Sequence, residues 1–173
     1  LHARPDDDGR FDEALDSATR ACRLDPLSLI VFSSCAEVSY YARRYDEALA
    51  DLRHALDMDP AFVPAHLDRG RVLIQVGRYD EAITSYETAI RLLGADPTTA
   101  FPLAYAFARA GRTDEARRIL ATLEAMHERG EPVSPWGLGT VHHGLGDRAR
   151  TLDWLEVAAR ERDRALVNIR VHP

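Results

Sequence analysis

The sequence predicts an all-α fold, a right-handed superhelix of antiparallel helix pairs, and two observations carry this prediction. The five-residue word Arg-Tyr-Asp-Glu-Ala occurs at residues 44–48 and 78–82, with near copies at residues 10–14 and 112–116, so consecutive copies begin 34 residues apart. Between the copies, apolar residues recur at spacings of three and four, which places them on one face of a helix. A fixed period of this length indicates stacked units that share one continuous core.

The period divides the chain into about four repeats and a partial one at the N-terminal end. The expected segments are a disordered lead at 1–9, a partial repeat with only its second helix at 10–26, a repeat at 27–60, a repeat with a three-residue insertion at 61–97, a repeat at 98–129, a divergent repeat at 130–163, and a C-terminal cap or tail at 164–173. The helices expected within them span residues 11–24, 29–42, 45–58, 63–76, 79–93, 99–110, 113–128, 136–145 and 149–161.

Particular residues mark the starts and ends of these helices. We expect a left-handed backbone, which ends the first helix of each pair, at Gly9, Gly77, Gly111 and Gly146, with Arg43 in the same place in one unit. The Asp-Glu of each word falls in the first turn of the second helix, where exposed N–H groups favour negative charge, and its alanine lets the paired helices approach. Thr98 or Thr99 is the expected N-cap of the helix that contains Pro102, and Ser134 followed by Pro135 starts the helix after it.

The period, the turn glycine with its aromatic-Asp-Glu-Ala, and the closing Asp-Pro at residues 25–26 and 59–60 resemble tetratricopeptide repeats over about residues 9–160. A narrower similarity, carried by residues 40–48, 133–136 and 146–163, is to the C-terminal repeat regions of bacterial multidomain regulators. In those proteins repeats follow a winged-helix DNA-binding, protein kinase or cyclase domain. The resemblance implies a partner-binding tail separated from such a domain, or a free-standing relative.

Composition and charge exclude several classes of partner. The net charge is −6, with arginines and carboxylates interleaved throughout, whereas a nucleic-acid surface needs a clustered basic face. The longest apolar runs, such as residues 27–32, are far shorter than the roughly 20 residues of a membrane span, and the start lacks the apolar region of a signal peptide. We therefore expect no nucleic-acid or membrane binding by this region and a location in the cytoplasm, or in the periplasm if a membrane segment precedes it.

The first helix of each pair is expected to line the concave side of the superhelix and to bind a protein or peptide there. Aromatic residues and arginines, which dominate binding energy at protein interfaces, are frequent on these helices. Helical spacing places on this side Ser33, Glu37, Tyr40, Tyr41, Leu67, Arg71, Ile74, Gln75, Phe101, Tyr105, Arg109, Trp136, Thr140 and His143. Any single one of them instead packs between helices if the helix phase is wrong by one position. The lysines and asparagines with which chaperone-binding tetratricopeptide domains clamp a carboxylate are missing from this set, so we expect an extended segment or a helix as ligand.

No catalytic residue, cofactor or metal site is expected. Cys22 and Cys35 lack metal-ligand spacing and are interpreted as buried small apolar residues, although they fall on neighbouring helices. His142 and His143 diverge by about 100 degrees on a helix, so with His127 they make a poor zinc site. The glycines at 137, 139, 144 and 146 follow no strand and are interpreted as close helix packing and a helix stop.

These observations predict a non-enzymatic interaction scaffold, part of a bacterial regulatory or signalling protein. Two alternatives remain open. A sensory domain for a small ligand would show a closed pocket around Phe101, Tyr105 and Trp136. Self-association would use apolar residues such as Leu15 and Ala18, which an unpaired N-terminal helix leaves exposed.

Overall fold

The computed structural model describes residues 5–94 and 96–163, with the backbone alone for residues 5–11. The described chain is all-α, as expected, and the cap or tail predicted at 164–173 lies outside it. The helices are α1 (Pro5–Leu24), α2 (Leu29–Tyr41), α3 (Tyr45–Met58), α4 (Val63–Gln75), α5 (Tyr79–Leu93), α6 (Pro97–Arg109), α7 (Thr113–Glu128), α8 (Pro135–Gly144) and α9 (Arg148–Glu161).

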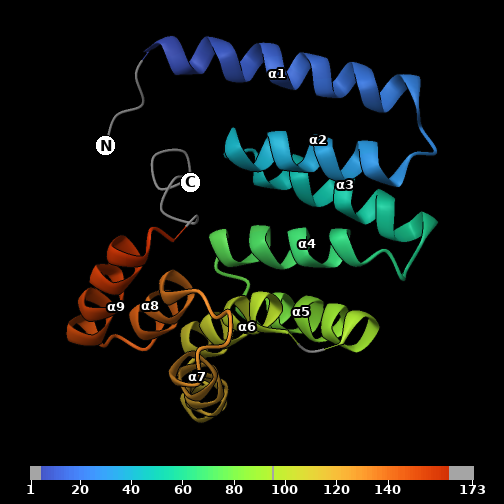
Figure 1. The fold of residues 1–173 in the computed structure, drawn as a ribbon. Helices are drawn as coiled ribbons and strands as arrows, with labels where there is room; N and C mark the ends of the chain where they lie inside the picture. Colours follow the sequence, from blue (N-terminus) through green and yellow to red (C-terminus); the bar gives the residue numbers. More distant parts are fainter. Residues whose placement is uncertain (1–4, 95, 164–173) are drawn as a thin grey trace.

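After α1, the helices form four successive antiparallel pairs that stack on one another (Figure 1). The stack has the right-handed superhelical fold that the sequence predicts. Three apolar clusters run along the stack: the first joins α2, α3 and α4, the second joins α4 to α7, and the third joins α6, α7 and α8. Each cluster therefore links one pair to its neighbour, as the period predicts. Of the four alanines in the repeated word, Ala48, Ala82 and Ala116 are fully buried, as expected for residues between paired helices, whereas Ala14 of α1 is partly buried.

The turns within the pairs confirm the predicted backbone. Gly77, Gly111 and Gly146 have φ angles of 74°, 80° and 79°, and Arg43 has a φ of 60°. Only glycine adopts this left-handed region without steric cost, so Arg43 is strained where its counterparts are not.

The start of α1 corrects the predicted N-terminal lead. The helix begins at Pro5, so residues 5–9 are helical, and Gly9 lies inside α1 instead of ending a helix. Proline suits the first helical position because it has no N–H to satisfy there, and the aspartates at residues 6–8 are favourable in a first turn. Pro5 and the three aspartates after it are therefore helix start signals present in the sequence. Residues 1–4 lie outside the described chain.

The start of α6 corrects a predicted cap. The N-cap is Asp96, whose carboxylate accepts hydrogen bonds from the backbone N–H groups of Thr98 and Thr99. Thr98 and Thr99 are therefore inside the helix, and Pro102 lies beyond the first turn instead of within it. Ser134 and Pro135 begin α8 as predicted, with Ser134 Oγ accepting from the N–H of Gly137 at 3.2 Å.

The two cysteines form a disulfide, Cys22–Cys35, which joins α1 to α2. The interpretation of both as unpaired apolar residues was wrong. Because α1 and α2 pack side by side, the two residues face each other across the helix contact, a relation that spacing alone did not establish.

Candidate peptide-binding face

The first helices of the four pairs, α2, α4, α6 and α8, carry all the predicted binding residues, and we call their shared side the first-helix face. Glu37, Gln75, Arg109 and His143 are exposed there. The others are partly or fully buried: Ser33, Tyr40, Tyr41, Leu67, Arg71, Ile74, Phe101, Tyr105, Trp136 and Thr140. The face thus combines an exposed layer of polar side chains with a packed layer beneath it.

Arg71 of α4 is the centre of the largest group of these residues. Its guanidinium lies 2.9 Å from a carboxylate oxygen of Asp68 on the same helix and 3.9 Å from one of Glu37 on α2. The guanidinium carbon stands 4.5 Å from the ring centre of Tyr40 and 6.0 Å from that of Tyr41. Cation–π contact with these rings and charge pairing with the two acids hold Arg71 between α2 and α4.

Tyr40 forms the floor of this group. Its side chain is fully buried, and its hydroxyl accepts a hydrogen bond from Nε2 of Gln75 at 3.3 Å. Burial raises the pKa of Tyr40 to about 12, although Arg71 and Gln75 act in the opposite direction. The phenol therefore stays protonated at neutral pH and contributes a ring face and a hydroxyl instead of a charge.

Two members of this group are absent from the sequence prediction. Asp68 pairs with Arg71, and burial raises the pKa of its carboxyl while Arg71 opposes the rise. Tyr86 of α5 packs its ring over Gly70, in the middle of α4, and burial raises the pKa of its phenol. The spacing of three between residues 68 and 71 and a glycine inside a helix were the signals that would have found them.

The aromatic residues of α6 face α8 closely. A Cβ placed on Gly137 would lie 2.7 Å from the Phe101 ring, and one on Gly144 would lie 2.9 Å from the Tyr105 ring. The glycines of α8 thus make room for these two rings, which confirms the close-packing interpretation. Nη1 of Arg109 donates to the Tyr105 hydroxyl at 3.1 Å, so only the polar edge of this pair faces outward.

At α8, Asp163 binds the start of the helix. Its carboxylate accepts from the Ser134 hydroxyl and, at 3.1 Å, from the backbone N–H of Trp136. Thr140 Oγ1 donates to the Gly137 carbonyl at 2.7 Å and is therefore engaged within its own helix. These contacts fix the entry of α8 against the end of α9.

The histidines near α8 are separately engaged. Buried His142 lies 3.0 Å from Glu124 of α7, and His127 Nδ1 lies 3.4 Å from the Val133 carbonyl. Among the described residues, no group of three or more histidines, cysteines or acids is arranged to hold a metal.

The remaining predicted residues are part of the core layer. Leu67 and Ile74 pack against the apolar cluster that joins α4 to α7. Ser33 has a buried hydroxyl without a hydrogen-bond partner in the described structure. The structure thus brings Glu37, Tyr40, Tyr41, Arg71 and Gln75 together, whereas the residues of α6 and α8 form a second group around the glycines.

Comparison with known protein families shows to which family the chain belongs. The sequence profile described as "Tetratricopeptide repeat" matches residues 40–97 and 73–131, which together span residues 40–131, more than half of the chain. The chain belongs to the tetratricopeptide repeat family. Comparison with curated proteins found no match.

Solved tetratricopeptide structures share the fold. A tetratricopeptide repeat protein from Parabacteroides merdae superposes with a TM-score of 0.73 at 22% identity, over 88% of this chain and 59% of the other. This chain therefore spans less than two thirds of that protein. MamA superposes with a TM-score of 0.64 at 15% identity, over 96% and 99% of the two chains. YrrB, described as having an unusual peptide-binding site, superposes at 0.58 and 21% identity, over 91% and 81%.

Proteins of this family are generally non-catalytic scaffolds for protein–protein interaction. Across the described residues, no helix has the length and apolar character needed to cross a membrane.

Proposed function

We propose that this tetratricopeptide chain is a non-enzymatic scaffold whose first-helix face binds a peptide segment of a partner, as part of a bacterial regulatory protein. The observation that carries the proposal is the group around Arg71, where side chains from α2 and α4 combine ring faces, an arginine and exposed polar groups. Such combinations supply most of the binding energy at protein interfaces.

Each member of the group has its own part in this proposal. Tyr40 is fully buried, so it supports Arg71 from below and does not touch the partner. Glu37 and Gln75 are exposed and offer an acceptor and donors to a peptide backbone or side chain. Because Arg71 already lies near two carboxylates, its group has no excess positive charge, and a C-terminal carboxylate is a poor ligand for it.

The small-ligand alternative has less support. Phe101 and Tyr105 pack over the glycines of α8. Two cavities, one between α1, α2 and α3 and one between α3, α4 and the start of α5, are lined by other residues.

For self-association through the N-terminal edge, the structure gives opposing observations: Leu15 is buried, whereas Leu24, Leu27 and Ile30 are exposed at the turn between α1 and α2.

The disulfide bears on the location of the protein. Disulfides persist mainly in oxidising compartments. The Cys22–Cys35 bond therefore favours the periplasmic alternative over the cytoplasm.

Site-specific photocrosslinking tests the proposed face. A photoreactive phenylalanine analogue at position 37, exposed on α2, is compared with one at position 84, exposed on α5 outside the face. In extracts of the source cell, position 37 is expected to give a discrete adduct that position 84 lacks. Glu37→Lys, which reverses one exposed charge, should weaken capture of the same adduct when the analogue is placed at position 75. Adducts from position 84 alone, or from neither position, would contradict the proposal.

A further inference from the structure

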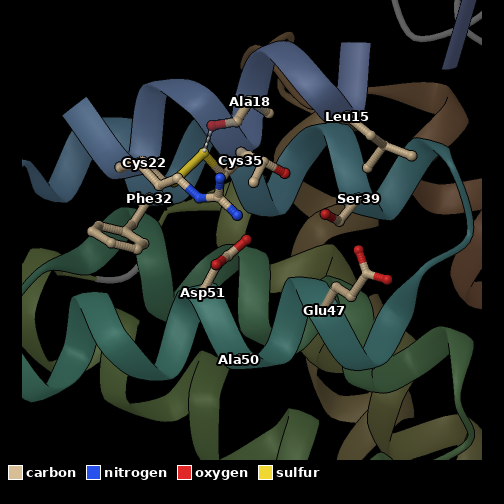
Figure 2. A pocket seen from close by; sticks show the side chains of 11 residues that line it. Leu15, Ala18, Cys22, Phe32, Cys35, Ser39, Glu47, Ala50 and Asp51 are labelled. Carbon is tan, nitrogen blue, oxygen red and sulfur yellow. Dashed lines mark hydrogen bonds between the residues drawn. A yellow bond between two sulfur atoms is a disulfide. The ribbon is translucent and has the colours of Figure 1, made fainter. Parts of the chain in front are cut away.

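The cavity between α1, α2 and α3 lies away from the first-helix face. It has a volume of about 410 Å³ (Figure 2). Apolar side chains, including Leu15, Ala18 and Phe32, line one part of it, and the carboxylates of Glu47 and Asp51 on α3 line another. The cavity therefore joins an apolar wall to an acidic one.

The next repeat shows what occupies the corresponding place. Thirty-four residues after Cys35 stands Arg69 of α4, which lies in the groove between α3 and α5. Its Nη1 donates to Ser85 Oγ at 3.0 Å, and its Nη2 lies 3.6 Å from a carboxylate oxygen of Glu81. The cavity that remains in this second groove is about 220 Å³. A guanidinium belonging to the chain thus fills part of the equivalent space.

The repeat period pairs the acidic wall with the residues that bind Arg69. Glu47 corresponds to Glu81 and Asp51 to Ser85, one period apart. Cys35 takes the place of the arginine and turns toward α1 to form the disulfide. The first repeat therefore keeps the acceptors for a guanidinium and replaces the guanidinium itself.

In the third repeat the residues at these two positions also match in character. There Leu103 corresponds to Arg69 and Ile119 to Ser85, and both are apolar members of one packed cluster. A leucine facing an isoleucine, and an arginine facing a serine, are satisfied pairs. In the first repeat Cys35 and Asp51 line the same cavity, and no arginine of the described chain pairs with this acid.

Ser39 adds a polar group to the wall of the cavity. Its side chain is 4% exposed and lines the cavity, and its hydroxyl forms no hydrogen bond with the described residues. In Figure 2 the hydroxyl points into the space between the helices. Because this hydroxyl lies on the cavity wall and has no partner among the described residues, it is available to a ligand group.

The charges around the cavity are unevenly compensated. Glu47 lies 3.4 Å from Arg44, whereas Asp51 forms no ion pair within the described chain. Burial, followed by the neighbouring charge of Glu47, raises the pKa of Asp51, while His54 acts in the opposite direction. Arg23 of α1 also lines the cavity but is exposed and pairs with neither acid in the part of the structure described.

We propose that this cavity binds an alkylguanidinium group, presented as an arginine side chain of a partner or as a free small molecule. Its N–H groups would donate to Asp51, Glu47 and Ser39, and its aliphatic stem would lie along Leu15, Ala18 and Phe32. The site is separate from the first-helix face and does not depend on the function proposed for it.

Titration of the full chain with blocked amino acids, followed by nuclear magnetic resonance, tests the proposal. N-acetyl-arginine methylamide should shift amide signals of α1, α2 and α3 saturably. N-acetyl-citrulline methylamide has nearly the same shape without the charge and should bind at least about tenfold more weakly. Equal binding of the two amides, or shifts confined to other helices, would overturn the proposal.

Agmatine, a free alkylguanidine, distinguishes the two sources of the ligand group. Tighter binding of the blocked arginine indicates a polypeptide partner, and tighter binding of agmatine indicates a small molecule. Failure of both to bind would overturn the proposal.

Variants of the cavity sharpen the test. Asp51→Asn should weaken arginine binding by about tenfold or more. The control Asp57→Asn, an exposed change on the same helix, should leave it unchanged. The double variant Cys22→Ser with Cys35→Arg restores the repeat arginine and should abolish binding, whereas Cys22→Ser with Cys35→Ser should retain it. Unchanged affinity in Asp51→Asn, or in the Cys35→Arg variant relative to its serine control, would overturn the site.

Discussion

Arg43 replaces the turn glycine of the other repeats, and this replacement costs free energy of folding. Its φ of 60° is one that glycine adopts freely at the equivalent turns. A left-handed conformation costs a side-chain-bearing residue about 1–2 kcal/mol, and glycine adds about 0.4–1 kcal/mol of unfolded-state entropy. The strain is the larger effect.

Arg43→Gly is therefore expected to raise the free energy of unfolding by about 0.5–1 kcal/mol. Urea denaturation measures the change. Gly111→Ala is the matched control of opposite sign, because its φ is 80° and no atom crowds a Cβ there. It should lower stability by about 1 kcal/mol. A destabilised Arg43→Gly protein would contradict the strain argument.

Gly70 tests the contact that organises the Arg71 group. A Cβ at this position would lie 2.6–2.8 Å from ring atoms of Tyr86, which is itself buried and cannot move aside freely. Gly70→Ala should lower the free energy of unfolding by about 1–2 kcal/mol, because overpacking outweighs the gain in helix propensity.

Gly139→Ala is the matched control for Gly70→Ala. The nearest side-chain atom to a Cβ at Gly139 is 3.4 Å away, so helix propensity should dominate and stability should be equal or higher by up to about 1 kcal/mol. Combining Gly70→Ala with Tyr86→Leu should reduce its cost. An equal cost with either residue at position 86 would exclude the ring as the cause.

At the scale of single helices, two kinds of helix start recur along the chain. Helices α2, α6, α8 and α9 have serine or aspartate N-caps with side-chain hydrogen bonds. Helices α3, α5 and α7 have as N-cap the arginine of the repeated five-residue word, and its side chain makes no such bond. That arginine instead forms an ion pair with the glutamate three residues later in the same repeated word. The distance from guanidinium nitrogen to carboxylate oxygen is 2.6 Å for Arg78 and Glu81 and 2.9 Å for Arg112 and Glu115. The acids in the first turn then interact with the helix dipole.

The ionisation of Asp96 makes the stability contributed by the start of α6 depend on pH. The Thr98 hydroxyl, and then the backbone N–H groups of Thr98 and Thr99, donate to its carboxylate and lower the pKa of Asp96. A lowered folded-state pKa stabilises the protein above the unfolded value, near 3.9, and this stabilisation is lost as pH falls through the folded-state pKa.

Asp96→Ala should accordingly lower the free energy of unfolding by about 1 kcal/mol at pH 7. The difference from the unchanged protein should shrink at pH 2 to 3. Asp96→Asn preserves a capping oxygen and should cost little at pH 7. Thermal unfolding at both pH values measures these effects, and a deficit of Asp96→Ala that persists at low pH would contradict the role of the ionised cap.

For the whole molecule, the disulfide attaches α1 to the stack. In α1, Leu15 is the one apolar residue buried among those whose side chains are described, so apolar packing contributes little there. The Cys22–Cys35 bond spans 13 positions of sequence, and a loop of this length constrains the unfolded chain by about 2–3 kcal/mol.

Reduction by dithiothreitol should therefore lower the free energy of unfolding by about 2–3 kcal/mol. The variant with both cysteines replaced by serine should match the reduced protein and should not respond to dithiothreitol. Hydrogen exchange should show the loss of protection first in α1. A reductant-insensitive unfolding curve would contradict this role.

Most of the fold could be predicted from the sequence because the helix ends and the turns between helices depend on residues that are close together in the chain. Each repeat carries its own turn glycine, first-turn acids and crossing alanine, and a helix end depends on such neighbouring residues. Errors occurred at Pro5 and Asp96, where a start signal was present but was assigned to a lead or a loop. The candidate binding residues followed from helical spacing, and their role in binding stays a prediction.

The sequence by itself determined the period, the helix pairs and the family, since these arise from short-range chemistry repeated every 34 residues. Tertiary structure alone decided that Cys22 meets Cys35, that Tyr40 is buried below Arg71, and that Asp51 borders an unfilled cavity. The physical reason is that these relations depend on the distance and rotation between neighbouring helices. A side chain's spacing along its own helix specifies neither of them.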